Sequence, residues 1–249
     1  MYKEIITKSL KDVFENYDAI LKALIIPVIL LFLIEYVSNE FTKPNEFGVF
    51  SIVLVILSLL VDMIILISVH RILILGRDSV PTWGIRSYTK REYKFVLKYL
   101  GMIGIVVLCL VPTILIFSQS PIFYMVALFV LTLVLIIISR ISLVFPAISI
   151  DEDMSFKESW ALTKNYKMLS FTTIIIFPLL FSIIVGGIYT LVIKFLAATI
   201  STDLNILLVL LNIAITVFLV SALSNTYMYI IYHTENGIYD EDQSDSIDD

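Results

Sequence analysis

The chain has 249 residues, of which 59% are hydrophobic and 16% are charged, and its formal net charge is −5. A water-soluble domain is nearer half apolar and a quarter charged, so this composition excludes a soluble globular fold. It indicates a membrane protein, and we expect an all-α, six-helix transmembrane bundle with no cofactor, no metal ion and no nucleic-acid partner.

The N-terminal segment, residues 1–20, has the pattern of an amphipathic helix that lies in the membrane interface. Apolar side chains share one helical face at Ile6, Leu10, Val13, Phe14, Tyr17 and Leu21. A helix with one apolar and one charged face binds at the boundary between headgroups and hydrocarbon. The segment lacks the short apolar region and the cleavage site of a signal peptide, so we do not expect it to be removed.

Six apolar stretches follow, each long enough for the roughly 20 helical residues that cross a hydrocarbon core. They cover residues 21–38, 49–70, 95–117, 122–148, 169–197 and 206–232. The last segment, 233–249, ends in DEDQSDSIDD and contains no lysine or arginine. This composition predicts an acidic, disordered tail.

The placement of lysine and arginine predicts the orientation of the spans. Basic residues concentrate in segments 1–22, 71–98 and 149–168, whereas the loops on the opposite side are short and almost free of them. Positive charge favours the cytoplasmic side, so we expect both termini in the cytoplasm. The sequence SFKE at 155–158 is typical of a capping box and predicts a second interfacial helix before the fifth span.

Three polar segments indicate a division into three helical hairpins. SLKDVFENYDAIL, SYTKREYKFVL and SWALTKNYKML each precede an odd-numbered span, and each has a serine followed by a tyrosine six to eight residues later. An internal repeat would explain the similarity, and chance agreement between short polar windows would explain it as well.

The segment GRDSVPTWGIRSYTKREYKF, residues 76–95, mixes cations with aromatic side chains. Such a mixture at the cytoplasmic face is typical of segments that contact anionic lipid headgroups. The simpler interpretation is that the basic residues only set the orientation of the spans. Together with one arginine just upstream, the candidate lipid contacts are Arg71, Arg77, Trp83, Arg86, Lys90, Arg91 and Lys94.

Two ionisable residues lie inside apolar spans, where a charge costs a few kcal/mol unless it is paired or hydrated. Asp62 precedes His70, at the inner end of the second span, by eight residues, and Arg140 precedes Ile150 by ten. At a rise of about 1.5 Å per residue, they lie about 12 Å and about 15 Å from the inner face. We hypothesise that Asp62 and Arg140 form an ion pair inside the bundle. The alternative is that Arg140 reaches the interface on its own.

No catalytic motif accompanies these charges. His70 and His233 lie outside any zinc-binding pattern, and the sequence has no phosphate-binding loop or serine-hydrolase signature. A metal is imaginable only at Asp151, Glu152 and Asp153, but a solvated loop before a helix is the simpler interpretation of these acids. Polar residues of the last span, which we expect to form interhelical hydrogen bonds, are Asn212, Ser221, Ser224 and Asn225.

The stretch SRISLVFPAISIDEDMSFKESWALTKNYK, residues 139–167, resembles a signature of bacterial six-span membrane proteins. This group includes the membrane domain attached to some glycerophosphodiester phosphodiesterases and related free-standing inner-membrane proteins. The positions that carry the resemblance are Arg140, Phe145, Pro146, the acids 151–153, Ser159, Trp160, Leu162 and Thr163. The resemblance implies a stand-alone module in a bacterial inner membrane. The phosphodiesterase activity belongs to a separate barrel domain, so we do not expect it here.

Three classes of function follow from these features. The first is a non-enzymatic membrane module that organises lipid or a protein partner at the cytoplasmic face, and the interfacial helices and basic loops favour it. The second is a small transporter or channel that uses Asp62 and Arg140. The third, a lipid-modifying enzyme, has only the acids 151–153 in its favour.

Overall fold

The computed structural model describes residues 1–41, 48–81, 83, 89–117, 119, 122–201, 204 and 207–237. These residues form helices and turns, with no strand among them. Six helical stretches are long and apolar enough to cross a membrane: Tyr17–Phe41, Val49–Leu75, Lys90–Phe117, Phe123–Ser149, Lys167–Thr199 and Leu208–Glu235. The all-α, six-helix architecture expected from the sequence is therefore confirmed, and the chain is a multi-pass membrane protein.

Several of the spans are built from more than one helical segment. In chain order the elements are α1 (Tyr2–Glu15), α2 (Tyr17–Phe41), α3 (Val49–Leu75), η1 (Arg77–Ser79), α4 (Lys90–Phe117), α5 (Phe123–Ile141), α6 (Val144–Ser149), α7 (Phe156–Leu162), α8 (Lys167–Phe171), η2 (Thr172–Ile176), α9 (Phe177–Phe181), η3 (Ser182–Gly186), α10 (Gly187–Thr199) and α11 (Leu208–Glu235). The segments η2 and η3 are π-helical. Residues 238–249 of the predicted acidic tail lie outside the described residues.

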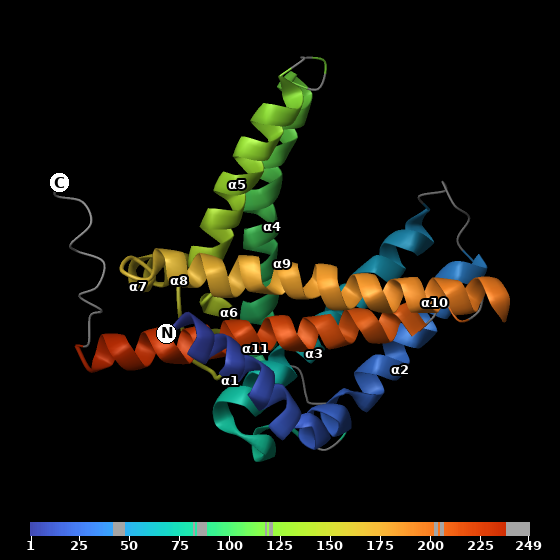
Figure 1. The fold of residues 1–249 in the computed structure, drawn as a ribbon, viewed down its shortest axis with the longest axis horizontal. Helices are drawn as coiled ribbons and strands as arrows, with labels where there is room; N and C mark the ends of the chain where they lie inside the picture. The colour runs from blue at the N-terminus through green and yellow to red at the C-terminus, as the bar shows by residue number, and fades with distance from the viewer. Residues whose placement is uncertain are drawn as a thin grey trace.

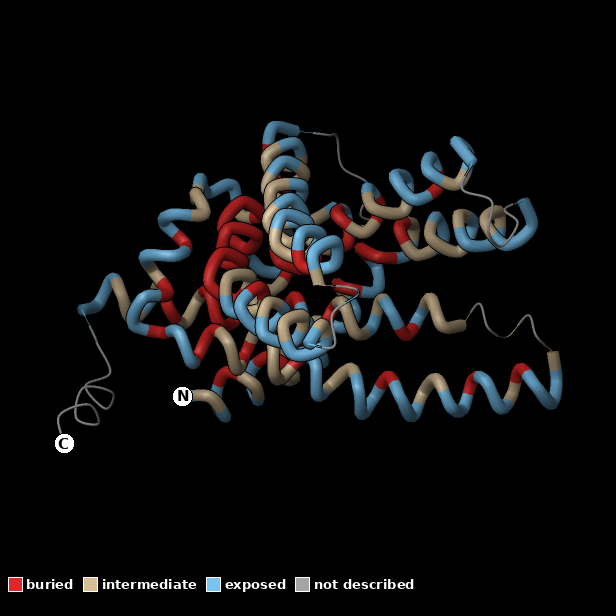
Figure 2. Tube along the Cα trace, turned by 90° about the horizontal axis from the view of Figure 1, so that it is seen from above, coloured by how far each residue is buried: buried red, intermediate tan, exposed pale blue. Residues whose placement is uncertain are grey.

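The spans form three antiparallel hairpins, α2–α3, α4–α5 and α8–α10 with α11 (Figure 1). The hairpins meet at one end of the molecule, where α1, α6 and α7 pack against them; we call this end the base. Away from the base the hairpins diverge, and α4–α5 points in a different direction from the other two. Buried residues gather at the base, whereas the far ends are mostly exposed (Figure 2). The three-hairpin division predicted from the sequence is present, with its packed core at one end.

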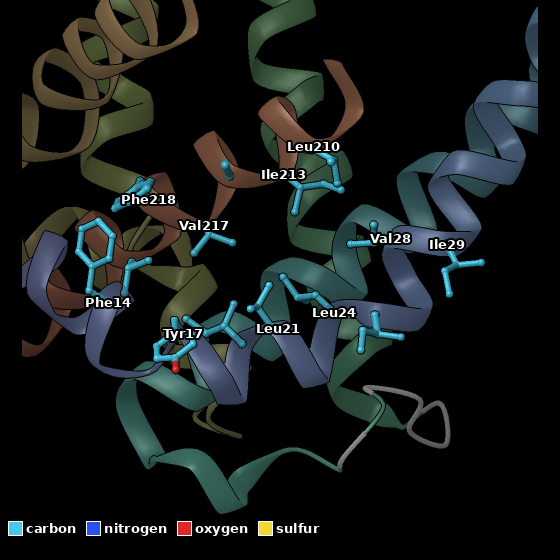
Figure 3. A pocket seen from close by; sticks show the side chains of 14 residues that line it. Phe14, Tyr17, Leu21, Leu24, Val28, Ile29, Leu210, Ile213, Val217 and Phe218 are labelled. Atoms are coloured by element: carbon cyan, nitrogen blue, oxygen red, sulfur yellow. The ribbon is translucent and has the colours of Figure 1, made fainter. Parts of the chain in front are cut away.

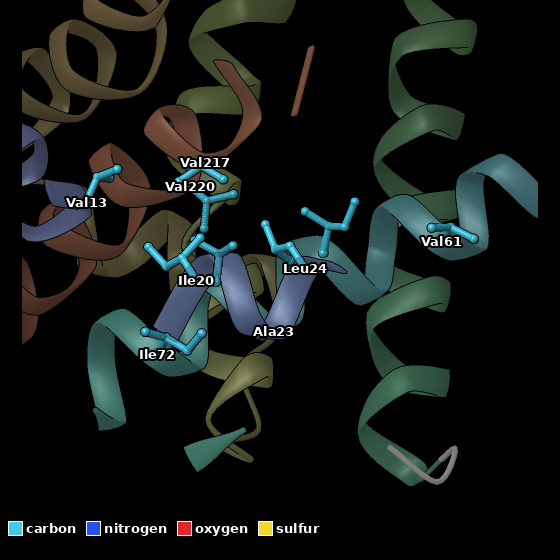
Figure 4. Packing of buried hydrophobic residues seen from close by; sticks show 10 residues of the cluster. Val13, Ile20, Ala23, Leu24, Val61, Ile72, Val217 and Val220 are labelled. Atoms are coloured by element: carbon cyan, nitrogen blue, oxygen red, sulfur yellow. The ribbon is translucent and has the colours of Figure 1, made fainter. Parts of the chain in front are cut away.

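One apolar cluster at the base joins the first hairpin to the last helix (Figure 4). Ile20 and Leu24 of α2 pack with Ile72 of α3 and with Val217 and Val220 of α11. Each of these side chains is less than 10% exposed, so the cluster is shielded from lipid as well as from water. Close packing of this kind is the main stabilising term between helices in a bilayer, because apolar side chains gain no hydrophobic free energy there.

The first helix packs against the rest of the protein through one row of residues. Ile5, Ser9 and Val13 of α1 are buried against α11, at a spacing of four residues. Phe14 and Tyr17, which belong to the apolar face predicted to contact the membrane interface, are 67% and 59% exposed on the protein. The predicted helix is present, and the contact of its exposed apolar side chains with the membrane stays a prediction.

The fourth span breaks ahead of Pro146. Helix α5 ends at Ile141 and α6 begins at Val144. In a continuous helix the proline ring would clash with the carbonyl of Ser142, four residues earlier, so the helix is interrupted there. Arg140 is consequently the penultimate residue of α5 and lies nine residues before the end of the Phe123–Ser149 stretch.

Helix α7 begins at the capping box expected from the sequence. The backbone N–H of Glu158 donates to Oγ of Ser155 at 3.2 Å, and the backbone N–H of Ser155 donates to the Glu158 carboxylate at 2.6 Å. The two bonds satisfy backbone donors that a helix start otherwise leaves unpaired. The second predicted interfacial helix is therefore confirmed as a helix.

Candidate functional site

A polar cavity of about 390 Å³ lies between α2, α3, α4 and α11. Its polar lining consists of Glu35, Ser58, Asp62, Tyr99, Asn212 and Thr216. Its apolar lining consists of Leu31, Ile34, Ile65, Leu66, Val209, Ile213 and Leu219. Four helices from all three hairpin-forming regions thus place hydrogen-bonding groups around one space inside the spans.

The cavity carries two carboxylates at different depths. Asp62 is the middle residue of the 27-residue helix α3, and Glu35 lies six residues before the end of α2, about 9 Å from that end. Neither carboxylate forms an ion pair with a described residue, and none of the described residues that line the cavity is basic. The cavity is therefore a place of negative potential within a low-dielectric surrounding.

Sequence reasoning identified Asp62 and missed Glu35. Glu35 falls three residues inside the predicted first span, and its position near the end made it resemble a terminal charge. The sequence did contain a signal for the cavity. Ser58 and Asp62 are four residues apart, and so are Asn212 and Thr216. That spacing places both members of each pair on one helical face.

A smaller hollow of about 170 Å³ continues from this cavity toward the base. Leu66, Tyr99 and Leu219 line both spaces, so these three side chains separate them. The hollow contains the buried ring of His70, whose Nδ1 lies 2.7 Å from Oγ of Ser224. The rest of its lining is mainly apolar, which makes it a narrower and drier space than the cavity around Asp62.

The predicted ion pair between Asp62 and Arg140 is not formed. No ion pair joins Arg140 to any acid in the described part of the chain, and Asp62 lines a cavity whose lining does not include Arg140. The prediction assumed that the fourth span runs without interruption to residue 148. Because α5 ends at Ile141, Arg140 lies at the base, whereas Asp62 lies halfway along α3.

Arg140 instead binds helix α7. Its guanidinium lies 3.6 Å from the ring centre of Trp160, and its Nη2 donates to the Trp160 carbonyl at 2.7 Å. In return, Oγ of Ser159 donates to the Arg140 carbonyl at 2.7 Å. Thr163 also contacts Arg140, since its hydroxyl lies 3.3 Å from Nε. Cations are favourable at a helix C-terminus, so this contact holds the end of α7 against α5.

The other residues of the resemblance motif are packing residues. The Phe145 ring lies 5.1 Å from the Phe95 ring, Pro146 is buried in α6, and Leu162 packs against the apolar cluster around Leu143 and Tyr166. The motif from Arg140 to Thr163 thus describes one structural unit, in which α5, α6 and α7 are joined at the base.

Most of the basic residues predicted to contact lipid have partners within the protein. Arg71 donates to the Asp151 carboxylate at 2.7 Å, Arg91 lies 3.1 Å from the same carboxylate, and Lys94 lies 2.6 Å from Asp153. Arg77 donates to the Asn16 side chain and to the Glu15 carbonyl. Trp83 and Lys90 are exposed, and Arg86 lies outside the described residues.

The acids 151–153 are exposed and precede α7, as expected of a solvated loop before a helix, and they also have partners within the protein. Asp151 joins the ends of α3 and α4 through Arg71 and Arg91, and Glu152 accepts a hydrogen bond from the hydroxyl of Tyr227 in α11. The three acids therefore connect three different helices at the base. No group of three or more potential metal ligands occurs among the described residues.

The polar residues of α11 make the interhelical hydrogen bonds predicted from the sequence, except for Asn212, which lines the cavity. Ser221 donates to the Ser9 carbonyl at 2.7 Å, and Asn225 donates to the Asp12 carboxylate at 2.9 Å. Together with the contact of Ser224 with His70, these bonds join α11 to α1 and α3.

A third hollow is an apolar groove of about 470 Å³ between α1–α2 and α11 (Figure 3). Phe14, Tyr17 and Leu21 face Phe218 and Val217 across it. It has no charged lining residue in the described part of the chain, and its position on the outside of the spans exposes it to acyl chains. Such a surface is ordinary for a membrane protein and identifies no ligand.

Comparison with known proteins adds no functional assignment. No family model, curated protein or solved structure matches the chain. The resemblance of residues 139–167 to six-span bacterial proteins therefore depends on its motif residues alone and stays a prediction.

Proposed function

We propose that the protein is a small, non-enzymatic membrane transporter that binds an amphipathic organic cation in the cavity around Asp62. The observation that carries this proposal is the presence of Asp62 and Glu35 in one intramembrane cavity without a basic residue among its described lining. Charged residues within spans are costly, and they commonly mark a substrate or ion pathway.

The lining also favours an organic ligand over a bare metal ion. A volume of about 390 Å³ is within the range of small-molecule sites, and about half of the lining is apolar. Asp62 would pair with the positive charge, and the ring of Tyr99 offers a face for a cation–π contact. The apolar groups opposite, such as Ile65 and Ile213, would contact the hydrocarbon part of the ligand.

The separation between the two inner spaces supports a transport role. Leu66, Tyr99 and Leu219 close the cavity on the side of the base, and the smaller hollow with His70 lies beyond them. Movement of these side chains would connect the cavity to the base. The positive-inside rule favours a cytoplasmic base, since the basic segments lie there, and the open side of the cavity would then face outward.

Equilibrium dialysis of the purified protein with radiolabelled tetraphenylphosphonium tests the proposal directly. We expect Asp62→Asn to weaken binding at least tenfold, because the substitution removes the charge and keeps the shape. The matched control is Asp18→Asn, since Asp18 is an exposed carboxylate of α2 that pairs with Lys22 outside the cavity. Equal binding by Asp62→Asn and the unmodified protein would overturn the proposal.

A second candidate is a module that organises lipid or a partner at the base. The exposed aromatic side chains of Trp83 and Trp160, which are 58% and 41% exposed, favour it because tryptophan prefers the membrane interface. Retention of a specific lipid by the protein in mild detergent, unchanged by Asp62→Asn and lost on Trp160→Leu, would favour this function over transport.

A further inference from the structure

Two buried arginines at the base share one exposed carboxylate. The side chains of Arg71 and Arg91 are 10% and 4% exposed, whereas that of Asp151 is 57% exposed. Nη1 of Arg71 lies 2.7 Å from Oδ2 of Asp151, and Nη1 of Arg91 lies 3.1 Å from Oδ1 and 3.2 Å from Oδ2. The two guanidinium groups are held by the fold, and the group that they bind is open to solvent.

The arginines are fixed by contacts that do not involve Asp151. Arg71 also donates to the Ser149 carbonyl at 2.9 Å and to the Ser79 carbonyl at 3.3 Å. Arg91 donates to the Glu92 carboxylate through both Nε and Nη2, at 3.0 and 2.6 Å. The pair of guanidinium groups would therefore keep its position if the Asp151 carboxylate left.

Arg71 and Arg91 together offer more hydrogen-bond donors than one carboxylate can accept. Nη2 of Arg71 donates no hydrogen bond to any residue in the described ranges. Each guanidinium carries five N–H groups, and an arrangement of this kind matches phosphate as well as carboxylate. A phosphate group presents three terminal oxygens and a charge near −2, so it satisfies more of these donors than a carboxylate does.

The backbone conformation at Asp151 is less favourable for aspartate than for glycine. Asp151 is the second residue after the end of α6 and has a φ of +69°. The N–H of Asp151 donates to the Ile148 carbonyl at 3.1 Å, and the N–H of Glu152 donates to the Ala147 carbonyl at 3.0 Å. This is the Schellman pattern, in which the residue with positive φ is usually glycine. An aspartate at this position gives up backbone stability and supplies an anion to the two arginines.

We propose that Arg71 and Arg91 form a binding site for a phosphate group, which the Asp151 carboxylate occupies when no phosphate is bound. The site joins the end of α3 to the start of α4, two helices that are long and apolar enough to cross a membrane. Exposed Lys90 adds a further positive charge beside Arg91. A phosphomonoester lipid headgroup and free phosphate share this chemistry.

Phosphate titration of three variants tests the site, with full-length protein in neutral detergent and calorimetry as the readout. We expect Asp151→Asn to bind inorganic phosphate at least tenfold more tightly than the unmodified protein. Asparagine tolerates positive φ, so the backbone is kept while the competing charge is removed. Asp153→Asn, in the same loop but paired with Lys94, is the control and should bind like the unmodified protein. Adding Arg91→Gln to Asp151→Asn should abolish the gain.

Two short-chain lipids distinguish the sources of the phosphate. A larger gain for dihexanoyl phosphatidic acid than for inorganic phosphate would identify a lipid headgroup, and equal gains would identify free phosphate. Dihexanoyl phosphatidylcholine controls for partition of the acyl chains. The proposal is overturned if Asp151→Asn binds phosphate no more tightly than Asp153→Asn does. It is also overturned if Asp151→Asn increases the affinity for phosphatidylcholine as much as that for phosphatidic acid.

Discussion

The Arg140 guanidinium lies 3.6 Å from the ring centre of Trp160 and donates to the carbonyl of the same residue at 2.7 Å. One side chain near the end of α5 thus binds both the ring and the backbone of a residue in α7. The arrangement explains an arginine at the end of an apolar run without an acidic partner, since its charge is stabilised by a ring face and by helix C-terminal carbonyls.

We expect Arg140→Gln to destabilise the protein by about 1–3 kcal/mol, because it removes a charged hydrogen bond and the cation–π contact. Trp160→Leu removes only the ring and should cost about 0.5–1 kcal/mol. Thermal unfolding in nanodiscs checks the order of the two variants. Equal losses would show that the carbonyl contact contributes nothing.

Loss of Oγ in Ser224 should leave Nδ1 of buried His70 without its partner. An unsatisfied buried polar group costs about 1–3 kcal/mol, so we expect Ser224→Ala to lower the unfolding temperature clearly. The double variant His70→Leu with Ser224→Ala removes both polar groups and should be more stable than Ser224→Ala alone. A double variant that is less stable than either single variant would contradict this account.

Substitution of one polar residue of the cavity wall should weaken ligand binding without lowering the stability of the protein. Asn212 lines the cavity and makes no hydrogen bond with a residue of the described ranges. Asn212→Leu should therefore weaken tetraphenylphosphonium binding by about tenfold, because the cation loses its interaction with the amide dipole, and leave the unfolding temperature unchanged or raised. Parallel losses of binding and stability would indicate a structural role for Asn212.

The capping box of α7 predicts a pH dependence outside the spans. Hydrogen bonds from the backbone N–H and the side chain of Ser155 lower the pKa of the Glu158 carboxyl from its ordinary value of 4.5. A group whose pKa is lower in the folded state contributes stability above its unfolded-state pKa, and that contribution is lost as the pH falls through the folded-state pKa. We expect α7 to loosen as the solution becomes more acidic than pH 4.5.

Trp160 reports this change, because the chain has two tryptophans and Trp83→Phe leaves only the one in α7. The emission of Trp160 should shift on acidification in the Trp83→Phe protein. Addition of Glu158→Gln should remove most of that pH dependence, and an unchanged profile would rule out the capping box as its source.

Local patterns in the sequence were sufficient to predict the helices, but not to predict which residues contact one another. The six spans and the capping box at Ser155 follow from hydropathy and from residues three positions apart. The error over Arg140 arose because its partner is Trp160 of α7, and because the helix is interrupted at Ser142 and Leu143. A proline allows a kink or a break, and the choice between them depends on tertiary packing.

The contacts of Asp151 and Glu152 could not be predicted either, and here the reason is different. Asp151 binds Arg71 and Arg91, which lie 80 and 60 residues earlier in the chain, and Glu152 binds Tyr227, 75 residues later. A single sequence contains no information on which of several basic loops meets an acidic one. Glu35 was missed for the same reason, since its importance depends on sharing a cavity with Asp62.

The contact of α1 with α11 has a consequence for how the protein is made. Ser9 and Asp12 receive their hydrogen bonds from Ser221 and Asn225, which lie 212 and 213 residues later. During synthesis the α2–α3 and α4–α5 hairpins can enter the bilayer as pairs, but the N-terminal helix still lacks α11, its main contact surface. Synthesis of the last span therefore completes the base, and a chain stalled before α11 leaves its first helix available to chaperones and proteases.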